Sequence, residues 1–428
     1  MNSAKIDAGT KASVRRSIAQ QISTIGEAVD DREVEEVIRD QVSAMGPSLG
    51  LDEAEAEAFS AELADDFLRL GPLEPLMSDE AISEIMVNGG GIDLETGAKL
   101  PPVVWVEIGG TIRPCPDCRF DDDDHLMRVI NRIGAQVGRE CSEASPLMDA
   151  RLADGSRVNA VYPSTAIDGP SLNIRRFRES VMTASALVEG GSCTIPMMEF
   201  LRSCVESRLN IIVSGGTGSG KTTLLNVLSG FIPRNERVVT IEDSAELKIA
   251  HPNRVRLEAR PANSEGRGRV TIHDLVVNSL RMRPDRIIVG ECRSDETIEM
   301  LQAMQTGHDG SLTTVHANNP VSVFSRLVTM CVSAQPALGP SVIERQIGEA
   351  VDLVVHTDRA ADGQRRISSI TSVEGYSDGV IVHNELFRSV AGRTGGLRFE
   401  ACGFRPRSIE ERIVHAGSRF DPSWFFDE

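Results

Sequence analysis

The sequence predicts an α/β protein, on three observations. Short apolar runs typical of buried strands alternate with helical patterns at 209–215, 237–243 and 286–291, as in a parallel sheet covered on both faces. The 428 residues suit two or three domains better than one. A stretch rich in small residues separates this half of the chain from a first half with a different pattern. We therefore expect an α/β domain at 192–428, preceded by a linker at 181–191.

The first half of the chain is expected to hold two further parts. Apolar residues at helical spacing predict a helical region over 1–70, with breaks at Asp30-Asp31 and Gly46-Pro47. Residues 71–180 mix helical and strand patterns, which predicts a separate mixed α/β domain. Its expected elements are helices at 81–86 and 125–137 and strands at 103–108, 156–163 and 171–177.

The chain is acidic, with 63 Asp and Glu against 45 Lys and Arg and a formal net charge of -18. This balance disfavours binding to nucleic-acid backbones as the main activity. Seven acids and no basic residue lie within Asp52–Asp66, which predicts a solvated helix face or, as the alternative, a docking surface. We find no apolar run of about 18 residues and no secretory signal, so a cytoplasmic protein without a membrane span is expected.

Eight cysteines are scattered along the chain, and their spacing does not indicate a disulfide framework. One CxxC, Cys115-Pro116-Asp117-Cys118, lacks a second ligand pair at the spacing that zinc requires. A turn is therefore expected here, with a metal or redox role as the weaker alternative. The four acids Asp121–Asp124 precede a predicted helix, whose dipole they complement.

The segment that carries chemistry is GGTGSGKTT, between a predicted strand and a predicted helix. It fits the phosphate-binding pattern GxxxxGK[ST] in the strand–loop–helix context that the pattern requires. Glycines let successive N–H groups surround phosphates, the helix directs its positive end at them, and a Thr hydroxyl can reach Mg²⁺. The chain has five Lys and forty Arg, yet a Lys occupies this loop, where a compact ammonium fits between phosphates. Nucleotide contacts are expected from Gly215, Gly216, Thr217, Gly218, Ser219, Gly220, Lys221, Thr222 and Thr223.

Two acids follow predicted strands, where a parallel sheet opens onto a nucleotide. Glu242 follows the run VVTI, and Glu291 ends RIIVGE, in which Gly290 stands where many families have Asp. Either glutamate could hold a metal or orient a water molecule. His308 and His316 flank the next expected strand, SLTTV; a histidine there could sense phosphate or be structural.

Four motifs in order resemble the type II/type IV secretion ATPase superfamily, with its Walker A motif, Asp box, Walker B motif and His box: GGTGSGKTT, TIEDSAEL, SLRMRPDRIIVGE and MQTGHDGSLTTVHANNP. Further runs resemble the branch called CpaF or TadA, the tight-adherence (Flp-type) pilus assembly ATPases: LGPLEPL, SEIMVNG, DARLADGSRVNAV, SLNIRRF, ITSVEGY and FRPR. The likeness covers about residues 65–415. It implies a C-terminal RecA-like P-loop ATPase domain behind the mixed α/β domain and the helical region.

The resemblance also implies a role for each site residue. Lys221 and Thr222 would bind phosphate and Mg²⁺, while Glu242 and Glu291 would divide metal positioning and water activation in an unassigned order. His316 would face the γ-phosphate region, and His308 would support the same box. In this superfamily, arginines of the N-terminal domain approach the nucleotide; the matching positions are Arg151, Arg157, Arg175 and Arg176, with ion pairs as the alternative role. Possible interface contacts are Arg281, Arg283 and Arg293.

The implied assembly is a cytoplasmic homo-hexamer that reaches the inner membrane through a polytopic platform protein and powers pilus assembly. One alternative is a relative that drives conjugation or effector secretion, which shares the same motifs. A RecA-like nucleic-acid translocase is disfavoured by the acidic charge and by 4% aromatic residues. A P-loop kinase for small molecules would have no use for the N-terminal domain or the paired histidines. Two features depart from the family pattern: a longer segment at 88–113 and the acidic N-terminal helices.

Overall fold

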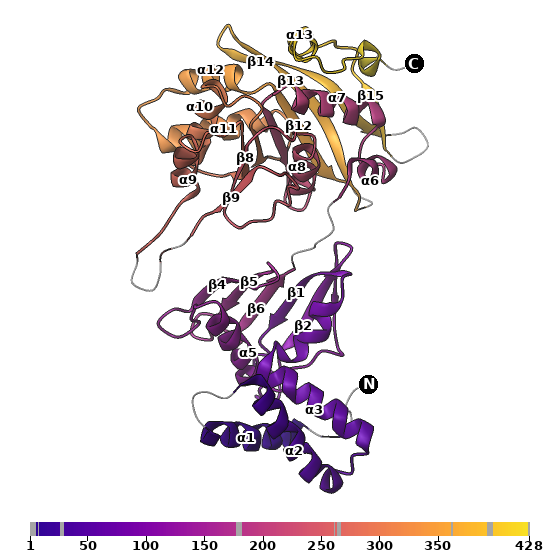
Figure 1. The fold of residues 1–428 in the computed structure, drawn as a ribbon, viewed down its shortest axis with the longest axis vertical. Coiled ribbons are helices and arrows are strands. Elements are labelled where there is room, and N and C mark those ends of the chain that lie inside the picture. The colour runs from indigo at the N-terminus through magenta and orange to yellow at the C-terminus, as the bar shows by residue number, and fades with distance from the viewer. Residues whose placement is uncertain are drawn as a thin grey trace. The chain divides into compact units, whose positions relative to one another are not determined.

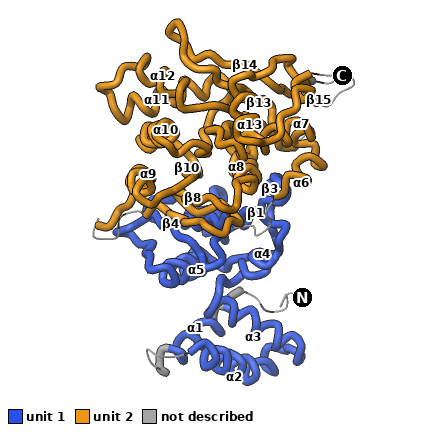
Figure 2. Tube along the Cα trace, turned by 45° about the horizontal axis from the view of Figure 1, so that its top comes forward, with its two compact units in different colours: residues 1–179 blue, residues 180–428 orange. Residues whose placement is uncertain are grey.

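In the computed structural model, the described residues are 6, 8–25, 30–176, 182–260, 262, 267–360, 363–391 and 397–426. They divide into two compact units, 1–179 and 180–428, coloured separately in Figure 2. Each unit has its own sheet and its own apolar core. The predicted α/β fold class is confirmed by these two sheets and the helices packed on them (Figure 1).

Three helices begin the first unit: α1 (Ala8–Ile25), α2 (Asp31–Leu49) and α3 (Glu53–Leu68). Asp30 and Asp52 cap α2 and α3, each in a capping box with the Glu three residues later, which satisfies N–H groups that a helix end leaves free. The helices bury a small core of their own, formed by Val14, Ile18, Val34, Ile38, Val42, Phe59 and Leu63.

The helix break predicted at Gly46-Pro47 is wrong, because α2 continues through both residues. Proline removes one N–H donor and crowds the carbonyl four residues before it. Here it lies in the last turn, where a single backbone hydrogen bond is lost. The helix ends instead at Gly50, whose φ of 68° is the left-handed conformation that glycine adopts at low cost.

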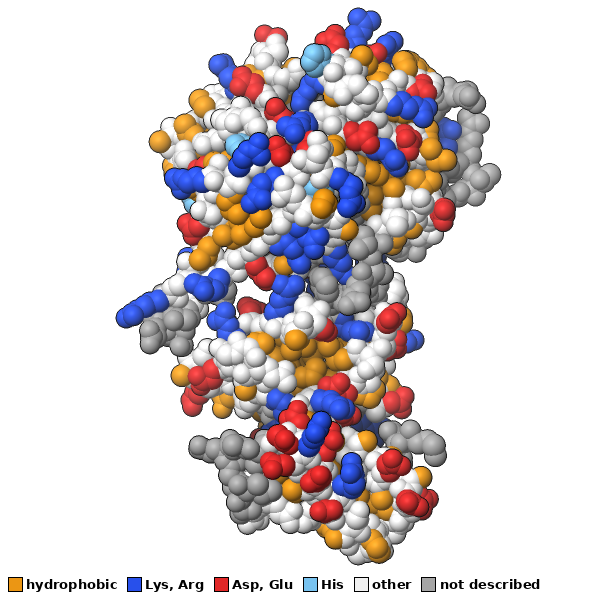
Figure 3. Space-filling view, in the orientation of Figure 1, with side chains coloured by type: hydrophobic (Ala, Val, Ile, Leu, Met, Phe, Trp, Pro, Cys, Tyr) orange, Lys and Arg blue, Asp and Glu red, His pale blue; other side chains and the backbone are white. Residues whose placement is uncertain are grey.

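A buried group of charges joins these helices to α5 (Asp123–Gln136). Arg15 on α1 pairs with Asp66 on α3 and with Asp121, just before α5. His125 on α5 lies 3.2 Å from Asp66, and the two side chains are 3% and 4% exposed. The solvated face predicted for the acidic run therefore does not include Asp66, although acidic side chains do gather over the visible face of these helices (Figure 3).

A six-stranded antiparallel sheet completes the first unit, in the order β3-β2-β1-β6-β5-β4. One set of alternate strand residues enters a core shared with α5. The short helices η1 (Gly71–Leu73) and α4 (Glu74–Ser78) lead into the sheet. Its strands are β1 (Ile82–Asn88), β2 (Val103–Ile108), β3 (Thr111–Pro114), β4 (Leu147–Arg151), β5 (Arg157–Val161) and β6 (Ser171–Arg175).

The helix predicted at 81–86 is wrong, because these residues belong to β1. Ile85 and Val87 are buried and alternate with partly exposed residues, and the strand pairs with β2 on one side and β6 on the other. A short apolar run does not separate helix from strand by periodicity alone. An irregular register between Ile82 and Glu84 further obscures the alternation.

The second unit is built on a nine-stranded sheet in the order β15-β14-β13-β12-β7-β11-β10-β8-β9. The strands from β12 to β9 in this order run parallel, and β13, β14 and β15 extend the sheet antiparallel. Every residue of β7 and β8 is buried, as expected for central strands covered on both faces. The strands are β7 (Ile211–Gly215), β8 (Val238–Glu242), β9 (Arg254–Glu258), β10 (Arg286–Cys292), β11 (Leu312–His316), β12 (Leu353–Arg359), β13 (Arg365–Ser377), β14 (Val380–Ala391) and β15 (Leu397–Ala401).

Helices cover both faces of this sheet (Figure 1), which gives the unit two separate apolar cores. One core contains residues of α7 and α8, and the other contains residues of α10, α11 and α12. Because the central strands are parallel, their carboxyl ends share one edge of the sheet. The helices are α6 (Ala184–Glu189), α7 (Ile195–Glu206), α8 (Lys221–Ser229), α9 (Ile272–Ser279), α10 (Glu296–Gln305), α11 (Ser322–Ala334), α12 (Pro340–Ala350), α13 (Arg407–His415) and η2 (Pro422–Phe425).

Most of the segment predicted as a linker, 181–191, is helical, because α6 occupies residues 184–189. Thr183 caps it by accepting a hydrogen bond from the Ala186 N–H at 3.1 Å, which is a common start signal for a helix. Residues 177–181, which include the first residue of the predicted linker, lie outside the described residues.

Cys115 and Cys118 lie in a turn, in which the Cys118 N–H donates to the Cys115 carbonyl at 3.3 Å. Burial raises the pKa of the Cys118 thiol to about 12, so the thiol stays protonated at neutral pH. In the described parts of the chain, no three His, Cys, Asp or Glu side chains group so as to hold a metal ion. Nor is any described helix long and apolar enough to cross a bilayer.

We expect Asp66→Asn to lower the free energy of unfolding of the first unit by about 2–3 kcal/mol, because Arg15 would lose its most buried carboxylate partner and keep only Asp121 and Glu62. Burial raises the pKa of Asp66, but hydrogen bonding to His125 and the charge of Arg15 outweigh burial and hold this pKa below its usual value. The contribution of ionised Asp66 to the free energy of unfolding should therefore be complete above about pH 4. It should be lost as the pH falls through the depressed pKa of Asp66.

Hydrogen exchange of first-unit peptides in increasing denaturant measures this free energy. Asp65→Asn is the matched control, because Asp65 pairs with Arg69 at the surface, where one pair contributes less than about 1 kcal/mol. Equal effects of the two substitutions would contradict a buried charge cluster.

Candidate functional site

The glycine-rich bend lies between β7 and α8, at the carboxyl edge of the parallel strands. Gly215, Gly218 and Gly220 have φ values of 152°, 70° and 99°, which side-chain-bearing residues rarely adopt. Gly220 caps α8 without a side-chain hydrogen bond, so the first N–H groups of the helix stay available to an anion. The bend exposes Thr217 and Gly218.

Side chains of β12, the strand next to β7, support the bend. The Ser219 and Thr357 hydroxyls lie 2.9 Å apart, and the Thr357 hydroxyl donates to the Ser214 carbonyl at 3.1 Å. The buried His356 ring lies 2.8 Å from the Ser214 hydroxyl. A Cβ at Gly215 would lie 2.2 Å from the Thr357 carbonyl oxygen, so only glycine fits there. These supporting hydroxyl and imidazole side chains could not be predicted from the sequence, because a buried side chain of this kind at a strand end has no distinctive sequence pattern.

Lys221 opens α8 and turns its side chain back over the bend. Its ammonium donates to the carbonyls of Gly215 at 3.1 Å and Gly216 at 2.8 Å. Burial lowers the pKa of Lys221, and the charge of Glu291 partly offsets this. Thr222 and Thr223 follow in the first helical turn and are half-buried. One cation and a set of free N–H donors thus converge on the bend, which is suited to a phosphate chain.

His316 and Glu291 lie beside that cation. The register of β7 and β11 sets His316 directly opposite Gly215, and its Nδ1 lies 3.3 Å from the Lys221 ammonium. Its Nε2 lies 3.0 Å from a Glu291 carboxylate oxygen, and Glu291 also pairs with Arg293. Burial lowers the pKa of His316 despite the charge of Glu291. A neutral ring can therefore accept from Lys221 through Nδ1, while its Nε2 lies beside the Glu291 carboxylate.

Glu242 ends β8, the strand next to β10 at the same edge of the sheet. One of its oxygens accepts hydrogen bonds from the Glu246 N–H at 2.6 Å and the Leu247 N–H at 2.7 Å. Its other oxygen is buried and has no hydrogen-bond partner among the described residues. Burial raises the pKa of Glu242, partly offset by those N–H groups. A Cβ at Gly290 would lie 3.1 Å from the Glu242 Cγ, so an added methyl group would push the Glu242 side chain aside.

The donor set at this edge fits Mg²⁺ better than a transition metal. It consists of hard oxygen atoms, namely the Thr222 hydroxyl and the carboxylates of Glu242 and Glu291. Mg²⁺ is usually held by one or two carboxylates together with substrate phosphates and water, and not by a protein cage. The buried, unpartnered oxygen of Glu242 is the group that such an ion would satisfy.

The arginines singled out in the sequence separate into different environments. Arg151, Arg157 and Arg175 stand opposite one another across β4, β5 and β6. Arg176 instead donates to backbone carbonyls of the first unit, those of Asp79 and Ile82. These four lie in the first unit and the glycine bend lies in the second, so their contact with a nucleotide stays a prediction.

Three of the residues singled out in the sequence lie away from the edge that carries the bend. His308 precedes the amino end of β11, so it does not lie beside His316. Arg281 and Arg283 likewise precede the amino end of β10, where they are exposed, and their role as interface contacts stays a prediction. The phosphate bend lies at the carboxyl ends of these parallel strands, which is the opposite edge of the sheet. Arg293 differs, because it follows β10 and contacts Glu291.

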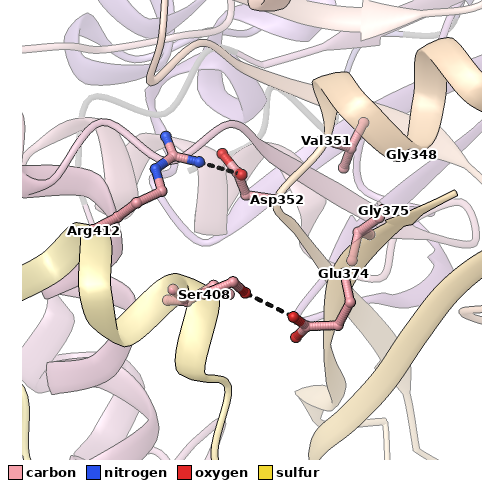
Figure 4. Close-up of a pocket in the computed structure, with 9 residues that line it drawn as sticks. Gly348, Val351, Asp352, Glu374, Gly375, Ser408 and Arg412 are labelled. Atoms are coloured by element: carbon pink, nitrogen blue, oxygen red, sulfur yellow. Dashed lines mark hydrogen bonds and ion pairs between the residues drawn. The ribbon is translucent and has the colours of Figure 1, made fainter.

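A cavity of about 200 Å³ lies elsewhere in the second unit, between α12, β13 and α13 (Figure 4). Arg412 pairs with Asp352 there, and Asp352 also accepts from the Asn210 N–H at 2.7 Å. The Ser408 hydroxyl donates to Glu374 at 2.7 Å. These contacts attach α13 to the sheet, and none of the residues of the bend lines the cavity.

We expect Gly290→Ala to slow ATP hydrolysis roughly 10-fold while nucleotide affinity changes little, because the added methyl group would displace Glu242 and not the bend. Steady-state turnover and nucleotide titration measure the two effects. Gly339→Ala is the control, since Gly339 has a φ of -72° and no atom within 4 Å of an added Cβ. An unchanged rate in Gly290→Ala would exclude this packing role.

Comparison with known proteins identifies relatives across most of the chain. The family model of the type II/IV secretion system protein matches residues 71–374. VirB11 of Rhizobium radiobacter is 42% identical over 320 residues, which are 67% of this chain and 88% of that protein. A Mycobacterium tuberculosis protein, named provisionally for conjugal transfer, is 36% identical over 326 residues, 75% of this chain and 89% of that protein.

Two solved structures are also similar. The VirB11 ATPase of the Brucella suis type IV secretion system, in complex with sulphate, is 29% identical, with 73% of this chain and 96% of that chain covered and a TM-score of 0.37. The Legionella pneumophila ATPase DotB is 21% identical, with 72% and 80% covered and a TM-score of 0.47. With the family match over residues 71–374, the chain belongs to the type II/IV secretion system protein family.

Proposed function

We propose that this chain is an ATP-hydrolysing motor subunit that powers assembly of a tight-adherence pilus or related secretion. The observation that carries the proposal is the chain of contacts from Lys221 through His316 to Glu291 above the glycine bend. A cation, a neutral imidazole and a carboxylate meet where a phosphate chain would lie. Phosphoryl transfer depends on such positioning and charge stabilisation.

Each residue then has a role in hydrolysis. The N–H groups of the bend and Lys221 hold the phosphate chain, while Thr222 and Glu242 would hold Mg²⁺, an ion that would supply positive charge to the phosphate oxygens. Glu291 orients the attacking water and accepts its proton, because His316 and Arg293 fix its carboxylate. The γ-phosphorus gains the water oxygen and loses the bridging oxygen, which leaves with ADP.

A homo-hexamer completes the proposed motor. Arg157 is the favoured arginine for neutralising charge on the transferred group, because its neighbours across the sheet are Arg151 and Arg175. The row continues with Glu84 opposite Arg175, so positive charge gathers at the β4–β5 end of this level of the sheet. An arginine suits this role because its guanidinium stays charged and can bind two phosphate oxygens at once.

Pilus assembly is the favoured output, supported by the sequence runs that resemble the CpaF or TadA branch. We place the motor in the cytoplasm, at the inner face of the membrane, where a polytopic platform protein would receive its movement. The relatives named for conjugal transfer and VirB11 support conjugation or effector secretion as the second candidate. The acidic charge disfavours stable nucleic-acid binding. Deletion of the gene, with surface fibres and DNA transfer both scored, separates the two outputs.

We expect Lys221→Ala to lower kcat/KM for ATP at least about 100-fold, because the phosphate chain would lose its cation in a desolvated site. Turnover with Mg²⁺ and mass by light scattering should be measured together. Lys99→Ala is the control, since Lys99 lies in the first unit and is 71% exposed. A wild-type protein that stays monomeric and hydrolyses nothing would refute the motor.

Arg157→Ala and Arg176→Ala should fail in different ways. Loss of Arg157 should lower kcat by at least about 10-fold, because it removes a charge that stabilises the transferred phosphoryl group. Loss of Arg176 should instead destabilise the first unit by about 1 kcal/mol, because the carbonyls of Asp79 and Ile82 lose the hydrogen bonds that its guanidinium donates. Turnover and thermal unfolding of both variants test the assignment. The reverse pattern would place the catalytic arginine at 176.

A further inference from the structure

Arg365, the first residue of β13, lies against the phosphate bend. A Cβ built on Gly220 would lie 3.4 Å from Cδ and 3.6 Å from Cβ of Arg365. The residue is exposed, and its guanidinium makes no hydrogen bond or ion pair within the described parts of the chain. The neighbouring Arg366, by contrast, donates to the Gln364 side chain at 2.8 Å. An uncompensated cation therefore borders a site built for an anion.

The strand order fixes the side from which Arg365 approaches. Glu291 and His316 end β10 and β11, which lie on one side of β7, whereas β12 and β13 lie on the other side. Arg365 therefore borders the bend opposite the groups that face the γ-phosphate. A triphosphate is a linear chain, so a γ end at His316 directs the α end toward Arg365.

The backbone around Arg365 is held in place. The Ser192 hydroxyl donates to the Arg365 carbonyl at 2.8 Å, and the Ile367 N–H donates to the Ser192 carbonyl at 2.9 Å. These two bonds fix the start of β13 to the segment between α6 and α7. The side chain thus starts from an ordered backbone position beside the bend, so less freedom is lost when it binds a ligand.

We propose that Arg365 binds the α-phosphate end of the nucleotide. The inference rests on the proposed ATP site and adds a residue that recognises a part common to ATP and ADP. A guanidinium can donate two parallel hydrogen bonds to phosphate oxygens. Arg365 therefore contributes to nucleotide affinity and not to the chemical step, unlike His316 and Glu291.

Titration of ADP and of adenylyl imidodiphosphate, an ATP analogue that resists hydrolysis, into the full-length chain tests the proposal. Arg365→Ala should weaken both ligands equally, by roughly 10-fold, which is the range for one charge-assisted hydrogen bond. Its KM for ATP should rise by a similar factor with kcat retained, and Arg365→Lys should recover part of the affinity. Arg366→Ala, the control on the opposite face of the same strand, should bind both ligands as the wild type does.

Three results would overturn the proposal. Unchanged affinity in Arg365→Ala would remove the contact. A loss for the ATP analogue alone, with lower kcat, would instead place Arg365 at the γ-phosphate. Wild-type protein that binds neither ligand would overturn the proposed ATP site itself, and the inference with it. A folded Arg365→Ala variant, checked by circular dichroism and thermal unfolding, keeps the first two results interpretable.

Discussion

The parallel pairing of β7 with its two neighbours is the constraint on which the site depends. It sets His316 on β11 and Thr357 on β12 on either side of Gly215, where the chain leaves the sheet and enters the bend. Thr357 supports the bend through Ser219, and His316 links Lys221 to Glu291. A shift of the β7–β11 register would separate the cation from the carboxylate, and a shift of the β7–β12 register would remove the support of the bend, while either shift would leave the glycine pattern intact.

Burial acts differently on the charges of the two units. In the second unit, burial lowers the pKa of Lys221 and raises that of Glu242. Both side chains have lost solvation by water, and a charged ligand could replace it. In the first unit, Asp66 is buried but paired with Arg15, and its pKa falls. The arrangement in the second unit is suited to binding, because a ligand can supply the missing partner. The paired charges of the first unit instead fix helices in place.

Much of the second unit could be predicted from the sequence, because fully buried parallel strands are continuous apolar runs and the glycine bend has a specific pattern. Long-range pairing could not be predicted. The contact of Arg365 with the bend joins residues 145 positions apart, and the bracing by Thr357 depends on a strand partner that no local pattern identifies. β1 was misassigned because its apolar run is short. Asp66 was misassigned because a buried acid is indistinguishable from a solvated one until its partners on α1 and α5 are known.

The most direct test of the central claim is a structure determined with Mg²⁺ and a non-hydrolysable ATP analogue. We expect the phosphate chain to lie on the N–H groups of the bend. The Lys221 ammonium should have moved from the Gly215 and Gly216 carbonyls to phosphate oxygens, and the γ-phosphate should lie near His316 and Glu291. A nucleotide bound elsewhere, or a Lys221 still bonded to those carbonyls beside an empty bend, would contradict the central claim.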